Sequence, residues 1–124
     1  MSEELYGVVV CHGALAGALV QAAEQISGVS GALIPVSNTG CDRDTLEERV
    51  LAAVNGRPAV VFVDLASGSC LFAVLKRLRS EQSVKVVTGV NLAMLVDFVF
   101  HRGLSPAEAA IRAAAAGEKS IRVP

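Results

Sequence analysis

The feature that most constrains the fold is a succession of short apolar runs rich in β-branched residues, each followed by apolar residues at helical spacing. The runs are too continuous for strands with one solvent-facing side, so they predict strands buried on both faces, as in a parallel sheet. The alternating pattern predicts an α/β fold with right-handed crossovers: a doubly wound, mainly parallel sheet with helices on both faces. The expected strands are residues 5–11, 32–36, 59–64 and 84–88.

Capping signals mark several helix starts. Asp44 followed by Glu47 fits a capping box, and Asn91 can cap the helix after the fourth strand. Ser105 before a proline is a strong start signal for the last helix, which is alanine-rich. A short final strand is expected at residues 120–123. With 124 residues, the chain is long enough for one domain, residues 1–124, and too short for two.

Composition and charge exclude several function classes. The formal net charge of -1, from 11 basic and 12 acidic side chains, lacks the basic footprint that non-specific nucleic-acid binding needs. No apolar run approaches the roughly 20 residues that span a bilayer, so we expect no membrane insertion. The acidic start, Met1–Glu4, lacks the basic region of a signal peptide, and three cysteines suggest no disulfide framework. We therefore expect a cytoplasmic protein.

The chemistry-bearing residues fall at the ends of the first and third expected strands. In the common strand order 2-1-3-4, a crevice opens between the carboxyl ends of these two strands. The first strand runs into Cys11-His12-Gly13 and the third ends at Asp64, so we expect His12 and Asp64 to be neighbours. Helices begin here after Gly13 and after Ser67-Gly68-Ser69, and their free N–H groups, with the serine hydroxyls, can bind an anion.

This set of residues points to chemistry at phosphorus. A carboxylate bonded to one ring nitrogen fixes the tautomer and leaves the lone pair of the other nitrogen as a nucleophile. The carboxylate also stabilises positive charge that develops on the ring, and phosphoryl transfer depends mainly on position and charge stabilisation. The crevice offers no Walker-type loop and no metal-binding cluster, so we expect no cofactor and no metal.

The same residues have structural interpretations. A lone histidine is often structural, and Asp64 and the two loop serines could be plain helix caps. Cys11 and Cys70 are expected to be small apolar core residues. His101 is expected to be a cation at a helix C-terminus. A receiver-like domain with Asp64 as phosphoryl acceptor is a further alternative, but it needs an acidic cluster for Mg²⁺ that Cys11-His12 does not supply.

Three segments of the chain resemble one known family. They read Val-Val-Cys-His-Gly at 9–13, Val-Phe-Val-Asp-Leu-Ala-Ser-Gly-Ser at 61–69 and Thr-Gly-Val-Asn-Leu-Ala-Met-Leu at 88–95. Their order and spacing resemble the IIA component of the mannose-type (mannose, fructose, sorbose) permeases of the bacterial phosphoenolpyruvate-dependent sugar phosphotransferase system. The resemblance extends over nearly the whole length, which would make the chain a single IIA-type phosphocarrier domain.

The resemblance implies roles for particular residues. His12 would accept a phosphoryl group from the histidine-phosphorylated carrier HPr and pass it to a IIB component, and Asp64 would hold the active histidine. Ser69 and the backbone of Ser67-Gly68-Ser69 would contact the phosphoryl oxygens. The family forms homodimers in which a C-terminal strand, here Ile121–Val123, is packed or exchanged across the interface.

The chain departs from the family pattern at three places. Cys11 stands where the family usually has threonine or serine before the histidine. Ser67-Gly68-Ser69-Cys70 replaces the usual Gly-Gly-Ser-Pro loop, and Ala93 replaces a proline. These departures leave open a second function, a regulatory module of the same fold that senses phosphorylation without a transport partner.

Overall fold

The sheet forms as the apolar runs predict. The computed structural model describes residues 4–124, and in them four parallel strands are ordered β2-β1-β3-β4. Most of the acidic start, Met1–Glu3, lies outside the described residues. The strands are β1 (Tyr6–Cys11), β2 (Leu33–Ser37), β3 (Ala59–Val63) and β4 (Val84–Thr88). The expected order 2-1-3-4 is therefore confirmed.

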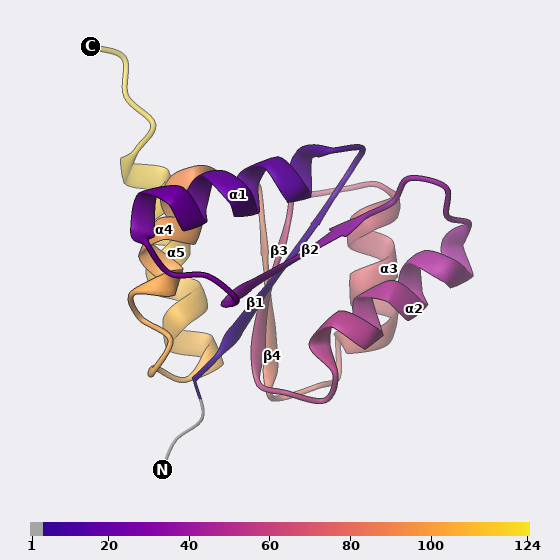
Figure 1. The fold of residues 1–124 in the computed structure, drawn as a ribbon. Coiled ribbons are helices and arrows are strands. Elements are labelled where there is room, and N and C mark those ends of the chain that lie inside the picture. The colour runs from indigo at the N-terminus through magenta and orange to yellow at the C-terminus, as the bar shows by residue number, and fades with distance from the viewer. Residues whose placement is uncertain (1–3) are drawn as a thin grey trace.

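Helices cover both faces of this sheet, as expected for a doubly wound fold (Figure 1). α1, α4 and α5 share an apolar core with one face, and α2 and α3 share another with the opposite face. Within residues 4–124, no helix has the length and apolarity needed to cross a membrane. The helices are α1 (Leu15–Ser27), α2 (Arg43–Val54), α3 (Ser69–Leu78), α4 (Leu92–Val99) and α5 (Pro106–Lys119).

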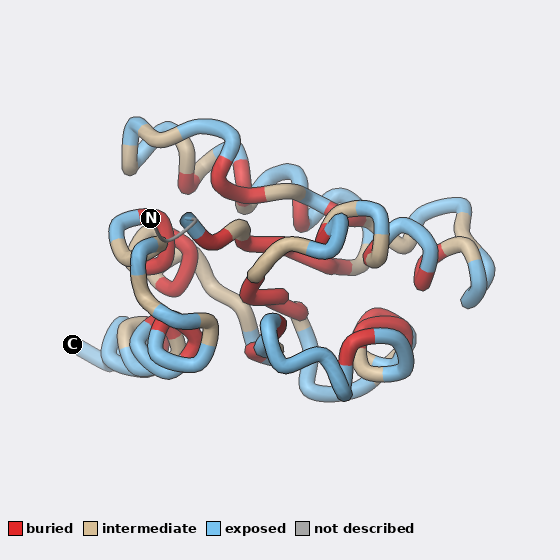
Figure 2. The backbone as a smooth tube through the Cα atoms, turned by 90° about the horizontal axis from the view of Figure 1, so that it is seen from below, coloured by how far each residue is buried: buried red, intermediate tan, exposed pale blue. Residues whose placement is uncertain are grey.

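The central strands β1 and β3 are buried on both faces (Figure 2). Val9 and Phe62 face the α1, α4 and α5 side, where the Phe62 ring meets Phe98 edge to face at 5.4 Å between centroids. Val8 and Val10 face the α2 and α3 side. Alternate residues thus enter two separate cores, which is why these runs show no polar alternation.

One helix start differs from the expectation. The N-cap of α2 is Asp42, whose side chain accepts a hydrogen bond from the Thr45 N–H at 2.8 Å, and not Asp44. Glu47 is buried instead of closing a capping box, and it pairs with Lys76 and Arg77 of α3. The expected caps of α4 and α5, Asn91 and Ser105, are confirmed.

The last residues form no strand within the chain. Residues 121–124 continue from the end of α5 and project away from the sheet (Figure 1), so they have no strand beside them to complete a ladder. Ile121 is 75% exposed and Val123 is 98% exposed. The expected strand at 120–123 is therefore absent from the single chain, and its exchange between two chains stays a prediction.

Candidate active site

A histidine and an aspartate meet at the carboxyl edge of the sheet. β1 pairs with β3 in parallel, with Val10 opposite Val63, so the residues that follow both strands emerge side by side. Asp64 Oδ2 lies 2.8 Å from His12 Nδ1 and accepts a second hydrogen bond from the His12 backbone N–H at 2.9 Å. The backbone and the ring of His12 are thus both held by one carboxylate oxygen.

The electrostatics of this pair fix which ring nitrogen is free. Burial raises the pKa of Asp64, but hydrogen bonds from the His12 N–H, the His12 ring and the Leu65 N–H together hold that pKa below its ordinary value. Asp64 is therefore ionised at neutral pH and can only accept, so Nδ1 is the nitrogen that donates to it; in the neutral form of the ring the lone pair is then on Nε2. The side chain of His12 is 40% exposed, against 10% for Asp64, so the ring can be reached from solvent.

The N-terminus of α3 lies beside Nε2. Ser69 Oγ is 3.5 Å from Nε2. Gly68, the N-cap of α3, has a φ of 96°, and a Cβ at this position would stand 3.9–4.0 Å from the His12 ring. The Phe72 N–H donates the first helical bond, to Gly68 O, so the preceding N–H groups point out of the helix end. Free N–H groups at a helix N-terminus are able to bind an anion, and these lie next to the exposed nitrogen.

The structure places the other two expected phosphate-binding residues differently. The Gly13 N–H donates to Asn38 Oδ1 at 3.0 Å, and Gly13 O accepts from Ser37 Oγ at 2.6 Å, so Gly13 is engaged by the loop after β2. Ser67 is exposed, and no hydrogen bond joins it to His12 within residues 4–124. Sequence reasoning missed Ser37 and Asn38. The sequence could have indicated them, because β2 lies next to β1 and the polar residues at the end of β2 emerge at the same edge of the sheet.

Two cysteines lie at the site, and both are protonated. Burial, with the Asp64 charge adding to it, raises the pKa of Cys11 to about 12 and the pKa of Cys70 to about 11. Both are core residues, as expected, but Cys70 Sγ also lies 3.7 Å from His12 Nδ1. His12, Asp64 and Cys70 offer three metal-ligand atoms within 4.8 Å of one another. In this arrangement Nδ1 and Oδ2 satisfy each other, and the thiol keeps its proton.

The second histidine lies away from this site. His101 follows α4, and its Nδ1 lies 2.7 Å from Asp97 O and 3.5 Å from Asp97 Oδ1. The neighbouring Arg102 O accepts a hydrogen bond from the Leu5 N–H, at the amino end of β1. His101 is thus at the opposite edge of the sheet from His12, just after the C-terminus of α4.

Fold and site together define an open parallel α/β domain with a carboxylate-held histidine at the carboxyl edge of its sheet. A family model described as the fructose IIA component of the phosphotransferase system (PTS) matches residues 6–116. The chain therefore belongs to the family of IIA components of the sugar phosphotransferase system, proteins of phosphotransferase type.

Solved structures share this fold. A phosphotransferase system component EIIA from Streptococcus agalactiae has a TM-score of 0.88 at 18% identity, covering 96% of both chains. A mannose/sorbose specific IIA subunit from Enterococcus faecalis has a TM-score of 0.86 at 17% identity, covering 98% of this chain and 96% of its own. A sigma-54 interaction domain protein from Enterococcus faecalis has a TM-score of 0.80 at 14% identity, covering 98% of this chain and 96% of its own. No curated protein sequence matches the chain.

Proposed function

We propose that this chain is a single-domain, cytoplasmic phosphocarrier that accepts a phosphoryl group on His12 from histidine-phosphorylated HPr and passes it to a IIB component. The observation that carries the proposal is the 2.8 Å contact between Asp64 Oδ2 and His12 Nδ1. With the proton on Nδ1, the lone pair of the neutral ring is on Nε2, which lies 3.5 Å from Ser69 Oγ. Membership of the IIA family supports the same activity.

The proposed step uses only this chain and the phosphorylated donor. The lone pair of His12 Nε2 forms a bond to phosphorus while the phosphorus–nitrogen bond of the donor breaks, and that electron pair leaves with the donor ring. The His12 ring gains positive charge, and Asp64 stabilises it through the proton on Nδ1. The Ser69 hydroxyl and the N-terminus of α3 stabilise the phosphoryl oxygens. Transfer to IIB reverses these bond changes.

Labelling experiments test the acceptor. The protein is incubated with phosphoenolpyruvate, enzyme I and HPr, and its intact mass is measured. We expect a gain of one phosphoryl group that is labile in acid and stable in alkali. His12→Ala should abolish the gain, while His101→Ala, which removes the only other histidine, should leave it unchanged. Labelling that survives His12→Ala would contradict the assignment.

A regulatory module is the second candidate. It is favoured by the similar fold of the sigma-54 interaction domain protein and by the unusual Ser67-Gly68-Ser69-Cys70 loop. Addition of IIB to the phosphorylated chain separates the two functions. A phosphocarrier transfers its phosphoryl group to IIB, whereas a sensor keeps the group and changes its affinity for a regulatory protein.

The geometry argues against Asp64 as a receiver-like acceptor. Its Oδ2 accepts two hydrogen bonds from His12, and its Oδ1 accepts one from the Leu65 N–H at 3.0 Å. A phosphoryl group on Asp64 would have to break at least one of these contacts. An acyl phosphate would be labile in alkali, so the labelling experiment also distinguishes this alternative.

We also propose a homodimer joined through the C-terminal tail. Ile121 and Val123 are exposed apolar residues beyond the end of α5, and packing against a second chain would bury them. Light scattering on the full chain and on a variant ending at residue 119 tests this. The full chain should be dimeric and the shortened one monomeric, and a monomeric full chain would refute the proposal.

A further inference from the structure

A buried thiol joins the histidine and the aspartate of the candidate active site. Cys70, in the first turn of α3, is fully buried, and its Sγ lies 3.7 Å from His12 Nδ1. Asp64 Oδ2 lies 2.8 Å from the same nitrogen. Nδ1, Oδ2 and Sγ all lie within 4.8 Å of one another, and we call these three residues the active-site cluster. The expectation of no metal-binding cluster in this crevice was made without Cys70, which the structure adds to the pair.

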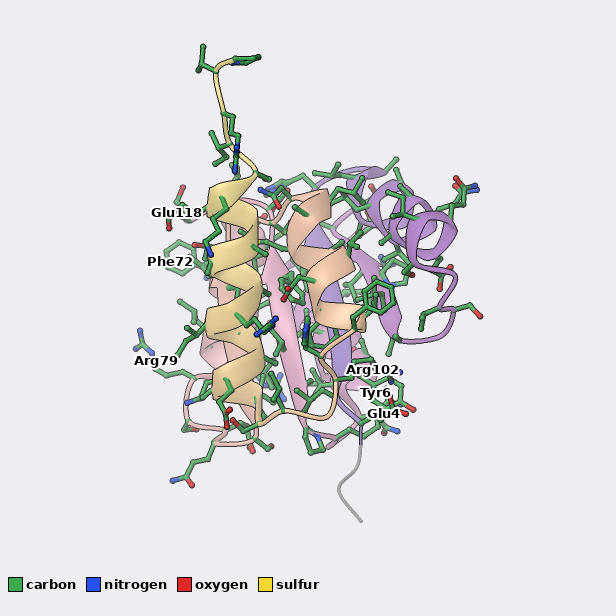
Figure 3. All side chains as sticks on the ribbon, turned by 90° about the vertical axis from the view of Figure 1, so that its left-hand side faces the viewer. Glu4, Tyr6, Phe72, Arg79, Arg102 and Glu118 are labelled. Carbon is green, nitrogen blue, oxygen red and sulfur yellow. The ribbon has the colours of Figure 1, made fainter. Side chains whose placement is uncertain are left out.

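The active-site cluster differs from the other acidic and histidine side chains of the molecule. Within residues 4–124, no other three histidine, cysteine or acidic side chains bring their ligand atoms so close together. Figure 3 shows the carboxylates of Glu4 and Glu118 at opposite ends of the molecule. His101 shares its acidic neighbour, Asp97, with the cationic side chain of Arg112, which would repel a metal ion. The active-site cluster is therefore the place where the described residues are best arranged to bind one.

The distances in the cluster are close to those of a tetrahedral zinc site. Zinc binds thiolate sulfur at about 2.3 Å and imidazole nitrogen at about 2.0 Å, so two such ligand atoms lie about 3.6 Å apart around one ion. Cys70 Sγ and His12 Nδ1 are already 3.7 Å apart. Nδ1 and Asp64 Oδ2 would have to separate from 2.8 Å to about 3.3 Å. The His12 side chain is 40% exposed, so its ring has room to rotate that far.

The carboxylate of the cluster is already held in place by the backbone. Asp64 Oδ2 accepts a hydrogen bond from the His12 N–H at 2.9 Å, and Oδ1 accepts one from the Leu65 N–H at 3.0 Å. A metal ion would replace only the contact to the ring, and outer hydrogen bonds of this kind orient a metal ligand. A thiolate and a carboxylate together neutralise the two charges of a divalent ion. The mixture of sulfur, nitrogen and oxygen ligands suits zinc and not magnesium or calcium.

We propose that His12 Nδ1, Asp64 Oδ2 and Cys70 Sγ bind a zinc ion, and that zinc at this site prevents phosphoryl uptake. The thiol releases its proton to solvent when its sulfur binds the ion. The ring gives up the proton on Nδ1 and, as a neutral ring, carries one on Nε2 instead, so one proton is released for each zinc ion bound. The lone pair that would attack phosphorus is thereby lost. The binding site stands on geometry, whereas its effect on uptake rests on the proposed function.

Cobalt is the probe for this site, because Co²⁺ can take the place of zinc and a thiolate bound to it gives a charge-transfer band in the near ultraviolet. Titration of the reduced, unphosphorylated full chain with Co²⁺ should produce this band, and one zinc ion per chain should remove it. Cys70→Ala should abolish the band and weaken zinc binding by at least about tenfold, since even the loss of an outer-shell partner costs that much. Cys41→Ser, which changes a half-buried thiol outside the cluster, is the matched control and should change neither.

His12→Ala is a second test that does not disturb the core, because this side chain is 40% exposed. It should also weaken zinc binding by at least about tenfold, whereas His101→Ala, its matched control, should not. Thermal melting verifies that each variant is folded. Absence of the cobalt band in the wild type, or a loss of affinity below about tenfold in a folded Cys70→Ala or His12→Ala variant, would overturn the zinc site.

Uptake from purified, phosphorylated HPr tests the effect on function. With free zinc at about ten times the wild-type Kd, about one site in eleven stays free, so uptake by the wild type should fall about tenfold. Cys70→Ala, which binds zinc more weakly, should lose no more than about half of its own zinc-free rate. Equal inhibition of the two proteins would overturn the inhibitory role. Labelling that persists in His12→Ala would refute the proposed function and leave the zinc-binding result standing.

Discussion

The substitution Asp64→Asn tests the reasoning about the site most directly. It keeps the shape of the side chain and removes the charge that faces His12 Nδ1 at 2.8 Å. An asparagine amide can also donate to Nδ1, which would move the ring proton to Nε2 and occupy the lone pair that should attack phosphorus. We expect the fold to survive and phosphoryl uptake from HPr to slow.

The size of this effect follows from the contact. A hydrogen bond to a charged group contributes about 1.5–3 kcal/mol. Two unit charges 2.8 Å apart would attract by about 6 kcal/mol at an effective dielectric constant of about 20. The ring is 40% exposed, so solvent screens much of that attraction, and we take about 2–3 kcal/mol. Uptake should then be about 30- to 160-fold slower.

Rapid-quench labelling followed by intact mass measures this rate. Asp97→Asn is the matched control, because Asp97 contacts the other histidine, His101, at 3.5 Å and lies away from the site. It should leave the rate unchanged. A rate for Asp64→Asn within about threefold of wild type, less than 1 kcal/mol, would refute the charge-pair reasoning and leave Asp64 as a structural cap.

The same variant should show a defined pH dependence of stability. The native pKa of Asp64 lies below its ordinary value, which is about 3.9 in an unfolded chain. Its stabilising contribution is therefore complete above about pH 4 and is lost as the pH falls through the native pKa. In urea denaturation, the difference in unfolding free energy between wild type and Asp64→Asn should shrink as the pH falls below about pH 4. A difference that grows below about pH 4 would contradict the sign.

Two further predictions concern packing and thiol reactivity. A Cβ on Gly7 would lie 2.6 Å and 2.8 Å from side chains of β2 and α4, so Gly7→Ala should lower the unfolding free energy by about 1–3 kcal/mol. A Cβ on Gly17, in α1, would have no other atom within 4 Å, so Gly17→Ala should raise the unfolding free energy by up to about 1 kcal/mol. Equal effects of the two substitutions in denaturant titrations would refute this contrast. In a thiol titration of the native protein, Cys41 should react first. Cys11 and Cys70, whose pKa values are about 12 and about 11, should react only when the protein unfolds. Fast labelling of all three would contradict it.

The fold and the central pair of the site could be predicted because they depend on regularities that local sequence carries. Continuous apolar runs indicate strands buried on both faces, and right-handed crossovers restrict the strand order. Once that order is assumed, the residues that end β1 and β3 must emerge together. His12 and Asp64 were therefore expected as neighbours although 52 residues separate them.

The details around the pair depend on loop geometry, which periodicity does not encode. Asp42 precedes α2 and Asp44 lies in its first turn, and the extended backbone at Asp42 makes Asp42 the cap. The Gly13 N–H was expected to face an anion, but Asn38 reaches it first. The contact between Cys70 and the His12 ring likewise depends on where α3 begins.

The position of β1 has a consequence for synthesis of the chain. β1 is made first, yet it lies between β2 and β3 in the sheet, and β3 emerges only some 50 residues later. At a translation rate of about 5–20 residues per second, the buried valines of β1 wait roughly 3–10 s for that neighbour. Until then one edge of β1 is unpaired and its two apolar faces are incompletely covered, as for any long-range pairing. The nascent chain is thus most exposed to aggregation just before the histidine and its aspartate can first meet.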